Sequence, residues 1–206
     1  MPRKAPRPLR KATLERSGGL IDARRSLLFV VDVQEKFVPV VANAAQVISR
    51  IALLVEAARA LAVPIALSEQ YPKGLGPTVR SLADRLPNEA ARFEKTTFSA
   101  FKAPEGAAQF AAQRKRGRNT VVLCGIETHV CVLQTAFDLA AHGYAPVLVA
   151  DATGSHRDCD RDLGLARLRH YGIPVLSSEM VVFEWLERAD RPEFKALQAL
   201  LKNEAR

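Results

Sequence analysis

The sequence has few cysteines, no apolar run longer than a strand, and no hydrophobic signal-peptide core behind its first residues. Its three cysteines are Cys124, Cys131 and Cys159, and their unpaired spacing favours free thiols in a reducing compartment over a disulfide framework. A transmembrane helix needs about 20 apolar residues, so we expect no membrane partner. Together these absences predict a soluble, cytoplasmic protein.

Recognisable cofactor and metal motifs are also missing. The single Gly-x-Gly, at residues 74–76, is followed by Val79 where a dinucleotide fingerprint needs its third glycine. No glycine-rich loop ends in Gly-Lys-Ser/Thr, as a nucleoside-triphosphate site would require. The four histidines show no metal-ligand spacing. We therefore expect no cofactor and no bound metal.

The positive charge is concentrated at the N-terminus. The net charge is +8, and the eight basic and two acidic residues of residues 1–25 account for +6 of it, leaving +2 on the rest. We expect residues 1–25 to be a basic, disordered extension and residues 26–206 to be one domain. No aromatic residue is interleaved with these charges for base stacking, which disfavours a nucleic-acid partner.

Beyond this extension, strand-sized apolar runs alternate with amphipathic helical segments. Strands are expected at residues 26–33, 63–70, 91–98, 119–126, 145–151 and 173–178, and helices at residues 42–62, 104–117, 130–142, 159–172 and 191–205. This alternation predicts an α/β fold, a single three-layer α/β/α domain with a mostly parallel, six-stranded, Rossmann-like sheet. Ligands bind such sheets beyond the carboxyl ends of the strands, so polar residues at those ends are the site candidates.

Two charged residues stand at expected strand ends. Asp32 follows five apolar residues, so its carboxylate should lie at the rim of a buried sheet, where loss of solvent raises its pKa. Lys95 ends the third strand. Taken alone, each residue also fits a bland role, Asp32 as a strand-terminating cap and Lys95 as a solvated surface charge.

Cys131 falls in the first turn of an expected helix, with Thr128 as its expected N-cap. The apolar stripe of that helix passes through Val132 and Ala136, and Cys131 lies off it. A thiol in a first turn feels the positive end of the helix dipole, which lowers its pKa, and the nearby amides can hold an oxyanion. These features favour a nucleophilic role for Cys131, whereas Cys124 lies inside an apolar strand and fits a structural one.

Three segments around these residues resemble motifs of the isochorismatase-like cysteine hydrolase superfamily. The stretch VVDVQEKF, residues 30–37, resembles its D-x-Q-x-x-F motif. The stretch FEKTTFSAF, residues 93–101, resembles its lysine segment K-x-x-x-S-x-F. The stretch CGIETHVCVLQTAFDL, residues 124–139, resembles its G-x-x-T-x-x-C-V-x-x-T block. The resemblance covers residues 26–178, with the three motifs in the family's order.

The resemblance implies a metal-independent hydrolase that cleaves a small amide or related C–N bond through a covalent thioester-type intermediate. Cys131 would be the nucleophile, Asp32 would carry the proton, and Lys95 would stabilise the thiolate. The family's cis peptide maps onto Ile126 and Glu127, and the backbone amides of Glu127 and Cys131 would form the oxyanion hole. The resemblance further implies a small-molecule substrate and a homo-oligomer.

Two departures narrow the resemblance to the isochorismatase-domain-containing, non-nicotinamidase subgroup. Residues 68–79 contain no histidine, whereas nicotinamidases bind a metal there through Asp-x-His. Isochorismatases that cleave a vinyl ether typically lack the cysteine, which this chain keeps. Phe37, Gln70 and Tyr71 are candidates for the substrate pocket, although ordinary packing explains them equally well. We expect His129 and His156 to be surface or supporting residues.

The residues leave two alternatives open. The same fold can hydrolyse an ether or ester without the thiol, in which case Asp32 would be the essential group. The chain can also be a non-catalytic binding or redox-sensing protein that keeps the site only as a scaffold.

Overall fold

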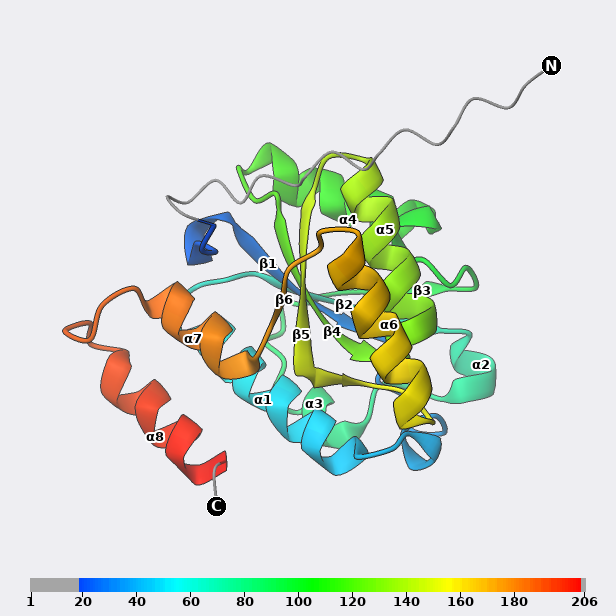
Figure 1. Cartoon of the computed structure of the whole chain (residues 1–206), viewed down its shortest axis with the longest axis horizontal. Coiled ribbons are helices and arrows are strands. Elements are labelled where there is room, and N and C mark those ends of the chain that lie inside the picture. The colour runs from blue at the N-terminus through cyan, green and yellow to red at the C-terminus, as the bar shows by residue number, and fades with distance from the viewer. Residues whose placement is uncertain (1–18, 205–206) are drawn as a thin grey trace.

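The computed structural model describes residues 19–204, in which six strands form one sheet (Figure 1). The strands are β1 (Ser26–Val31), β2 (Ile65–Gln70), β3 (Ala91–Lys95), β4 (Thr120–Ile126), β5 (Ala145–Gly154) and β6 (Val175–Leu176). Their order is β3-β2-β1-β4-β5-β6, and all five neighbouring pairs are parallel. The predicted fold class is confirmed, with a sheet that is entirely parallel.

Helices cover both faces of the sheet, as the continuous burial of strands such as β1 requires (Figure 1). The longer helices are α1 (Ala44–Ala60), α4 (Pro104–Lys115), α5 (Leu133–Ala141), α6 (Asp158–His170), α7 (Ser178–Leu186) and α8 (Phe194–Glu204). Helices α1, α7 and α8 share one buried cluster with one face of the sheet, and α4, α5 and α6 share a second cluster with the other face. Two cores therefore hold the sheet between two helical layers.

Short helical segments complete the described chain. They are the α-helical turns α2 (Pro72–Leu75) and α3 (Arg80–Ala83), the 3-10 turns η1 (Ala23–Arg25), η2 (Val38–Val40) and η3 (Ala100–Lys102), and the π-helix η4 (Thr128–Val132). None of the helices in residues 19–204 is long and apolar enough to cross a bilayer.

The predicted N-terminal extension falls mostly outside the described residues, since residues 1–18 are not among them. Its last part belongs to the folded body. Ile21 is buried against the core, and Ala23 begins the turn η1 directly before β1. The described fold therefore begins before the boundary predicted at residue 25.

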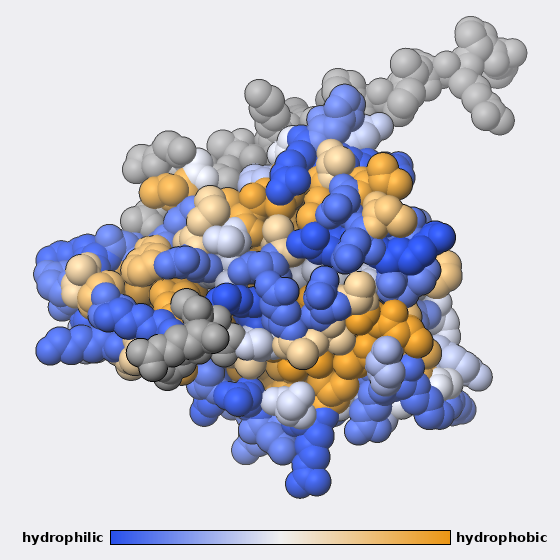
Figure 2. Space-filling model, turned by 60° about the horizontal axis from the view of Figure 1, so that its bottom comes forward, coloured by the Kyte–Doolittle hydropathy of each residue, from blue (hydrophilic) through white to orange (hydrophobic). Residues whose placement is uncertain are grey.

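Apolar side chains also reach the surface of the described chain. Figure 2 shows hydrophobic patches interrupting a largely hydrophilic face. The large exposed hydrophobic residues include Leu163 and Tyr171 at α6, and Met180 and Phe183 on α7. Single exposed apolar side chains are normal on a protein surface, and the homo-oligomer implied by the resemblance stays a prediction.

The strand order creates one break in the winding of the sheet. The chain passes from β1 outward to β2 and β3, and then returns to place β4 on the other side of β1. Connections that leave β1 and β4 in opposite directions open a crevice beyond the carboxyl ends of these two strands. Asp32 follows β1 and the Glu127–Cys131 segment follows β4, so both enter this crevice.

Candidate active site

Asp32 is held in the crevice by side chains from two neighbouring strands. It directly follows β1, has a left-handed backbone conformation (φ 51°), and is fully buried. Its Oδ1 accepts a hydrogen bond from Ser68 Oγ on β2 at 2.7 Å, and its Oδ2 accepts one from Lys95 Nζ on β3 at 2.6 Å. Burial raises the pKa of Asp32, and the charge of Lys95 opposes that rise without cancelling it.

Lys95 is fixed by oxygen atoms on several sides. Its ammonium group donates to Asp32, to Gln70 Oε1 at 2.6 Å, and to the carbonyls of Thr97 and Phe98 at 3.2 and 3.1 Å. The side chains of Lys95 and Asp32 have no exposed surface. The alternative of a solvated surface charge at Lys95 is therefore wrong, because this ammonium group is buried and paired.

The crossing from β4 to its helix differs from the expected α-helical start. Residues Thr128–Val132 form a π-helix, and α5 begins only at Leu133. Thr128 was expected to cap the helix, but its hydroxyl instead donates to the carbonyl of Gly154 at 3.0 Å and lies 3.0 Å from Thr153 Oγ1. That prediction was wrong because β5 offers closer partners. The Ile126–Glu127 peptide is cis, as the resemblance implied.

Cys131 is buried in this π-helical turn, close to Asp32 and Lys95. Thr135 Oγ1 donates to the carbonyl of Cys131 at 2.7 Å and accepts from the amide of Ala100 at 2.9 Å. Through these two hydrogen bonds, Thr135 connects the turn that contains Cys131 to the loop that follows β3, and Lys95 is the last residue of that strand. The carbonyl of Glu127 accepts hydrogen bonds from the backbone amides of Val130 and Val132, both at 3.2 Å. These two residues flank Cys131 in the sequence.

The pKa of the Cys131 thiol is opposite to the sequence-based expectation. Burial and the neighbouring charge of Asp32 raise the pKa of Cys131 to about 12, although Lys95 acts to lower it. The expectation that the helix dipole lowers this pKa was wrong, because the thiol is buried and faces a carboxylate. A hydrogen bond with Cys131 acts to lower the pKa of Asp32, against the larger effect of burial. The buried thiol of Cys131 and the buried carboxyl group of Asp32 therefore lie side by side, and the pKa of each is raised.

The three predicted pocket residues lie in different surroundings. Tyr71 lines a cavity of about 360 Å³ beside Lys95, together with Thr97, Pro104 and Glu105. Gln70 binds Lys95 through Oε1 and donates from Nε2 to the carbonyl of Thr96 at 3.0 Å, so it positions the lysine. Phe37 is half-buried against the core cluster that contains α1. Thr97, Pro104 and Glu105 were missed because nothing in their local sequence marks a cavity wall.

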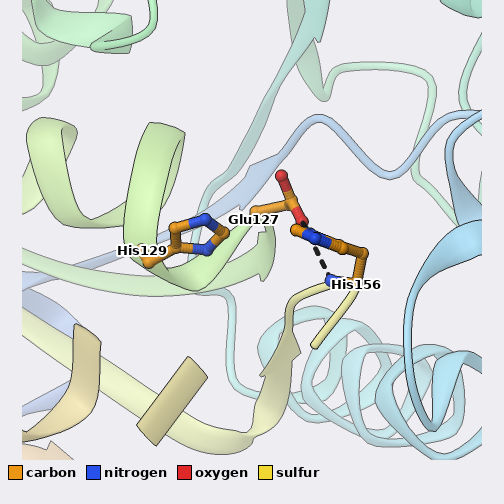
Figure 3. A group of neighbouring side chains, drawn as sticks. All are labelled: Glu127, His129 and His156. Carbon is orange, nitrogen blue, oxygen red and sulfur yellow. Dashed lines mark hydrogen bonds and ion pairs between the residues drawn. The ribbon is translucent and has the colours of Figure 1, made fainter. Parts of the chain in front are cut away.

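A second cluster, Glu127, His129 and His156, lies beyond the ends of β4 and β5, next to the crevice between β1 and β4. Their ligand-type atoms all lie within 4.8 Å of one another, and Figure 3 shows the three as neighbouring side chains. Both histidines were expected to be surface or supporting residues, and the structure has His129 half-buried and His156 exposed. The histidine spacing alone did not reveal this cluster, because the fold brings His156 from the end of β5.

Comparison with known proteins gives one consistent result. The Isochorismatase domain model matches residues 26–180. The chain is 39% identical to isochorismatase domain-containing protein 2A of Mus musculus over 191 residues, which are 93% of this chain and 89% of that protein. It is 40% identical to isochorismatase domain-containing protein 1 of Salmo salar over 188 residues, which are 91% of this chain but 64% of that longer protein.

Among solved structures, the fold is similar to that of the MAR1 ribonuclease from Caenorhabditis elegans. The two share a TM-score of 0.82 and 36% sequence identity, and the match covers 89% of this chain and 92% of that one. The sequence relatives and this structural neighbour each match about nine tenths of this chain.

Proposed function

The chain belongs to the isochorismatase domain family, whose fold supports hydrolase activity, and we propose that it cleaves a small amide or related C–N bond with Cys131 as nucleophile. The observation that carries the proposal is the convergence of a buried thiol, carboxylate and ammonium from the ends of three strands. Lys95 Nζ lies 2.6 Å from Asp32 Oδ2, and both charges act on the Cys131 thiol. No metal takes part in the proposed reaction.

The first half of the proposed reaction forms an acyl-enzyme. Asp32 takes the thiol proton while the Cys131 sulfur attacks the carbonyl carbon of the amide. The negative charge that develops on the carbonyl oxygen accepts hydrogen bonds from the backbone amides of Glu127 and Cys131. The C–N bond then breaks as Asp32 returns its proton to the nitrogen, which leaves a thioester and a free amine.

The second half releases the acid and restores the thiol. Asp32 takes a proton from water, whose oxygen attacks the thioester carbonyl. The C–S bond breaks, and the sulfur recovers the proton from Asp32. The raised pKa of Asp32 suits this shuttle, because a carboxyl group with an ordinary pKa would hold the thiol proton less readily.

The test compares two cysteine variants on a panel of small primary amides and ureido compounds. Cys131→Ala should lower kcat/KM at least about 10³-fold on any substrate found, because the covalent step is lost. Cys159→Ala is the matched control, since that thiol is exposed and outside the crevice. Mass spectrometry of quenched wild-type enzyme should find the acyl group on Cys131. Full turnover by Cys131→Ala contradicts the proposal and favours Asp32-centred hydrolysis.

RNA cleavage is the second candidate function, because the 36% identical structure bears the name of a ribonuclease. Incubation of the purified chain with single-stranded RNA separates the two candidates. Cleavage that persists in Cys131→Ser and is lost in Asp32→Asn would favour a phosphodiesterase over an amidase. If the RNA stays intact while an amide is turned over, ribonuclease activity is excluded and C–N bond hydrolysis is supported.

A further inference from the structure

The side chains of Glu127, His129 and His156 form a cluster and take no part in the catalytic chemistry proposed above. Glu127 follows β4, His129 belongs to the π-helix, and His156 follows β5. The crevice that holds Asp32 lies between β1 and β4, so the cluster occupies the neighbouring pair of strand ends. Figure 3 shows the Glu127 carboxylate directed toward His156, with the His129 ring on its other side.

The separations within the cluster fit a single ion. Metal–nitrogen and metal–oxygen bonds of about 2.0–2.2 Å place two ligands of one ion roughly 3.0–3.5 Å apart. His156 Nδ1 lies 2.9 Å from Glu127 Oε1, close to that separation already. All three ligand atoms lie within 4.8 Å of one another, so a small rotation of the side chains brings the third into place.

His129 is oriented in the way that metal-bound histidines usually are. One nitrogen of such a ring coordinates the ion, while the other is held by a neighbouring polar group. The Nδ1 of His129 lies 3.0 Å from the hydroxyl of Ser155, which is only 1% exposed. This contact fixes the ring and leaves Nε2 for a ligand. Gly164 of α6 packs against the His129 backbone, where an added Cβ would lie 3.2 Å from its Cα.

Glu127 is similarly constrained. Its side chain is 12% exposed, and its Oε1 accepts from the backbone amide of His156 at 2.9 Å. The side chain of His156 is 44% exposed, which leaves one side of the cluster open to solvent and to an entering ion. The cluster thus combines two supported ligands with one exposed ligand at the surface.

We propose that Glu127, His129 and His156 bind one divalent transition-metal ion of the zinc class. Two imidazoles and one carboxylate suit Zn²⁺, Co²⁺ or Ni²⁺, whereas Mg²⁺ and Ca²⁺ require oxygen ligands. The remaining position faces solvent. Glu127 belongs to both sites, because its carboxylate would hold the ion and its backbone amide is assigned to the oxyanion hole.

The experiment titrates the metal-stripped full chain with ZnSO₄ and CoCl₂ by calorimetry, with MgCl₂ as the control ion. We expect one zinc per chain, no Mg²⁺ binding, and a Co²⁺ visible spectrum without a thiolate charge-transfer band. His129→Gln, His156→Gln and Glu127→Gln should each weaken Zn²⁺ binding at least about tenfold, because each removes a ligand. His142→Gln and His170→Gln are the matched controls and should bind as the wild type does.

Cysteine thiols could bind Zn²⁺ in place of the cluster, and variants of the cysteines distinguish the two kinds of site. Cys131→Ser and Cys159→Ser should retain the single site with unchanged affinity. The proposal is overturned if the wild type shows no saturable one-to-one binding, if the His129 and His156 variants bind as tightly as the controls, or if either cysteine variant abolishes binding. Circular dichroism of every variant confirms that a loss of binding is not a loss of fold.

Discussion

At the scale of single residues, the pair of Asp32 and Lys95 dominates the electrostatics of the crevice. Both side chains are without exposed surface. Removing two charges from water costs several kcal/mol per ion, and attraction between them recovers this only with close geometry and further hydrogen bonds. Ser68 and Gln70 supply those additional bonds at 2.7 and 2.6 Å. The two charges are therefore tolerated together, and neither is tolerated alone.

Lys95→Met tests this dependence. The variant leaves Asp32 buried without its cation, so the free energy of unfolding should fall by about 3–5 kcal/mol, measured by urea denaturation at neutral pH. Lys102→Met is the control, because that side chain is 64% exposed and lies 3.8 Å from Asp138. Loss of such an exposed pair should cost about 1 kcal/mol or less. Equal losses in the two variants would contradict the account of the buried pair.

The pH dependence of thiol alkylation tests the pKa of Cys131. Because burial and Asp32 raise this pKa to about 12, the thiolate fraction at neutral pH is very small. The iodoacetamide reaction rate of Cys131 should rise about tenfold per pH unit from pH 7 to 10, without a plateau, as followed by peptide mass spectrometry. A plateau below pH 8 would show a resting thiolate and would remove the need for Asp32 as base.

At the scale of elements, the end of β4 determines where the thiol points. Gly125 adopts φ +115°, and the register of β4 against β5 shifts between Leu123 and Gly125. A Cβ at Gly125 would lie 2.1 Å from the carbonyl oxygen of Val31 on β1. Only glycine allows this approach of the two backbones. The cis peptide and the π-helix follow directly and carry Glu127 and Cys131 to the crevice.

Gly125→Ala should therefore be far more damaging than alanine at an ordinary left-handed glycine. Gly117 is the matched control, since it has φ +81° and no atom within 4 Å of an added Cβ. Gly117→Ala should cost about 1–2 kcal/mol from the backbone conformation alone. Gly125→Ala should exceed that cost by at least about 2 kcal/mol, because the Val31 backbone must also move, as measured by thermal unfolding. Similar losses at the two sites would contradict the close-approach argument.

Most of the longer elements could be predicted from apolar periodicity. Strand β3 ends at Lys95, as expected for the third strand, and the ammonium group of Lys95 binds the carbonyls of Thr97 and Phe98 in the loop that follows. Helix α7 was not predicted, since its sequence SEMVVFEWL is a nearly continuous apolar run without a polar face. Its Trp185 is completely buried and donates to Ser26 Oγ at 3.0 Å. That partner lies far away in the sequence and is invisible to a local pattern.

At the scale of the whole molecule, strand order is what assembles the site. Lys95 and Asp32 are 63 positions apart in the chain and meet because β3 and β1 both border β2. Cys131 joins them because β4 returns beside β1. The second cluster arises by the same means from β4 and β5, which bring Glu127 and His156 together across 29 positions. The two side-chain clusters thus share the segment that follows β4.

The sequence by itself determined the alternation of strands and helices, the parallel sheet, and which residue types, Asp32, Lys95 and Cys131, stand at or after three strand ends. Those properties depend on periodicity and residue type, which are local. Only the tertiary structure decided that the pKa of Cys131 is raised, that Gln70 holds Lys95, and that His129 and His156 meet at one carboxylate. Each of these depends on burial or on a partner distant in the chain, because solvent exclusion and side-chain proximity arise only when the layers pack.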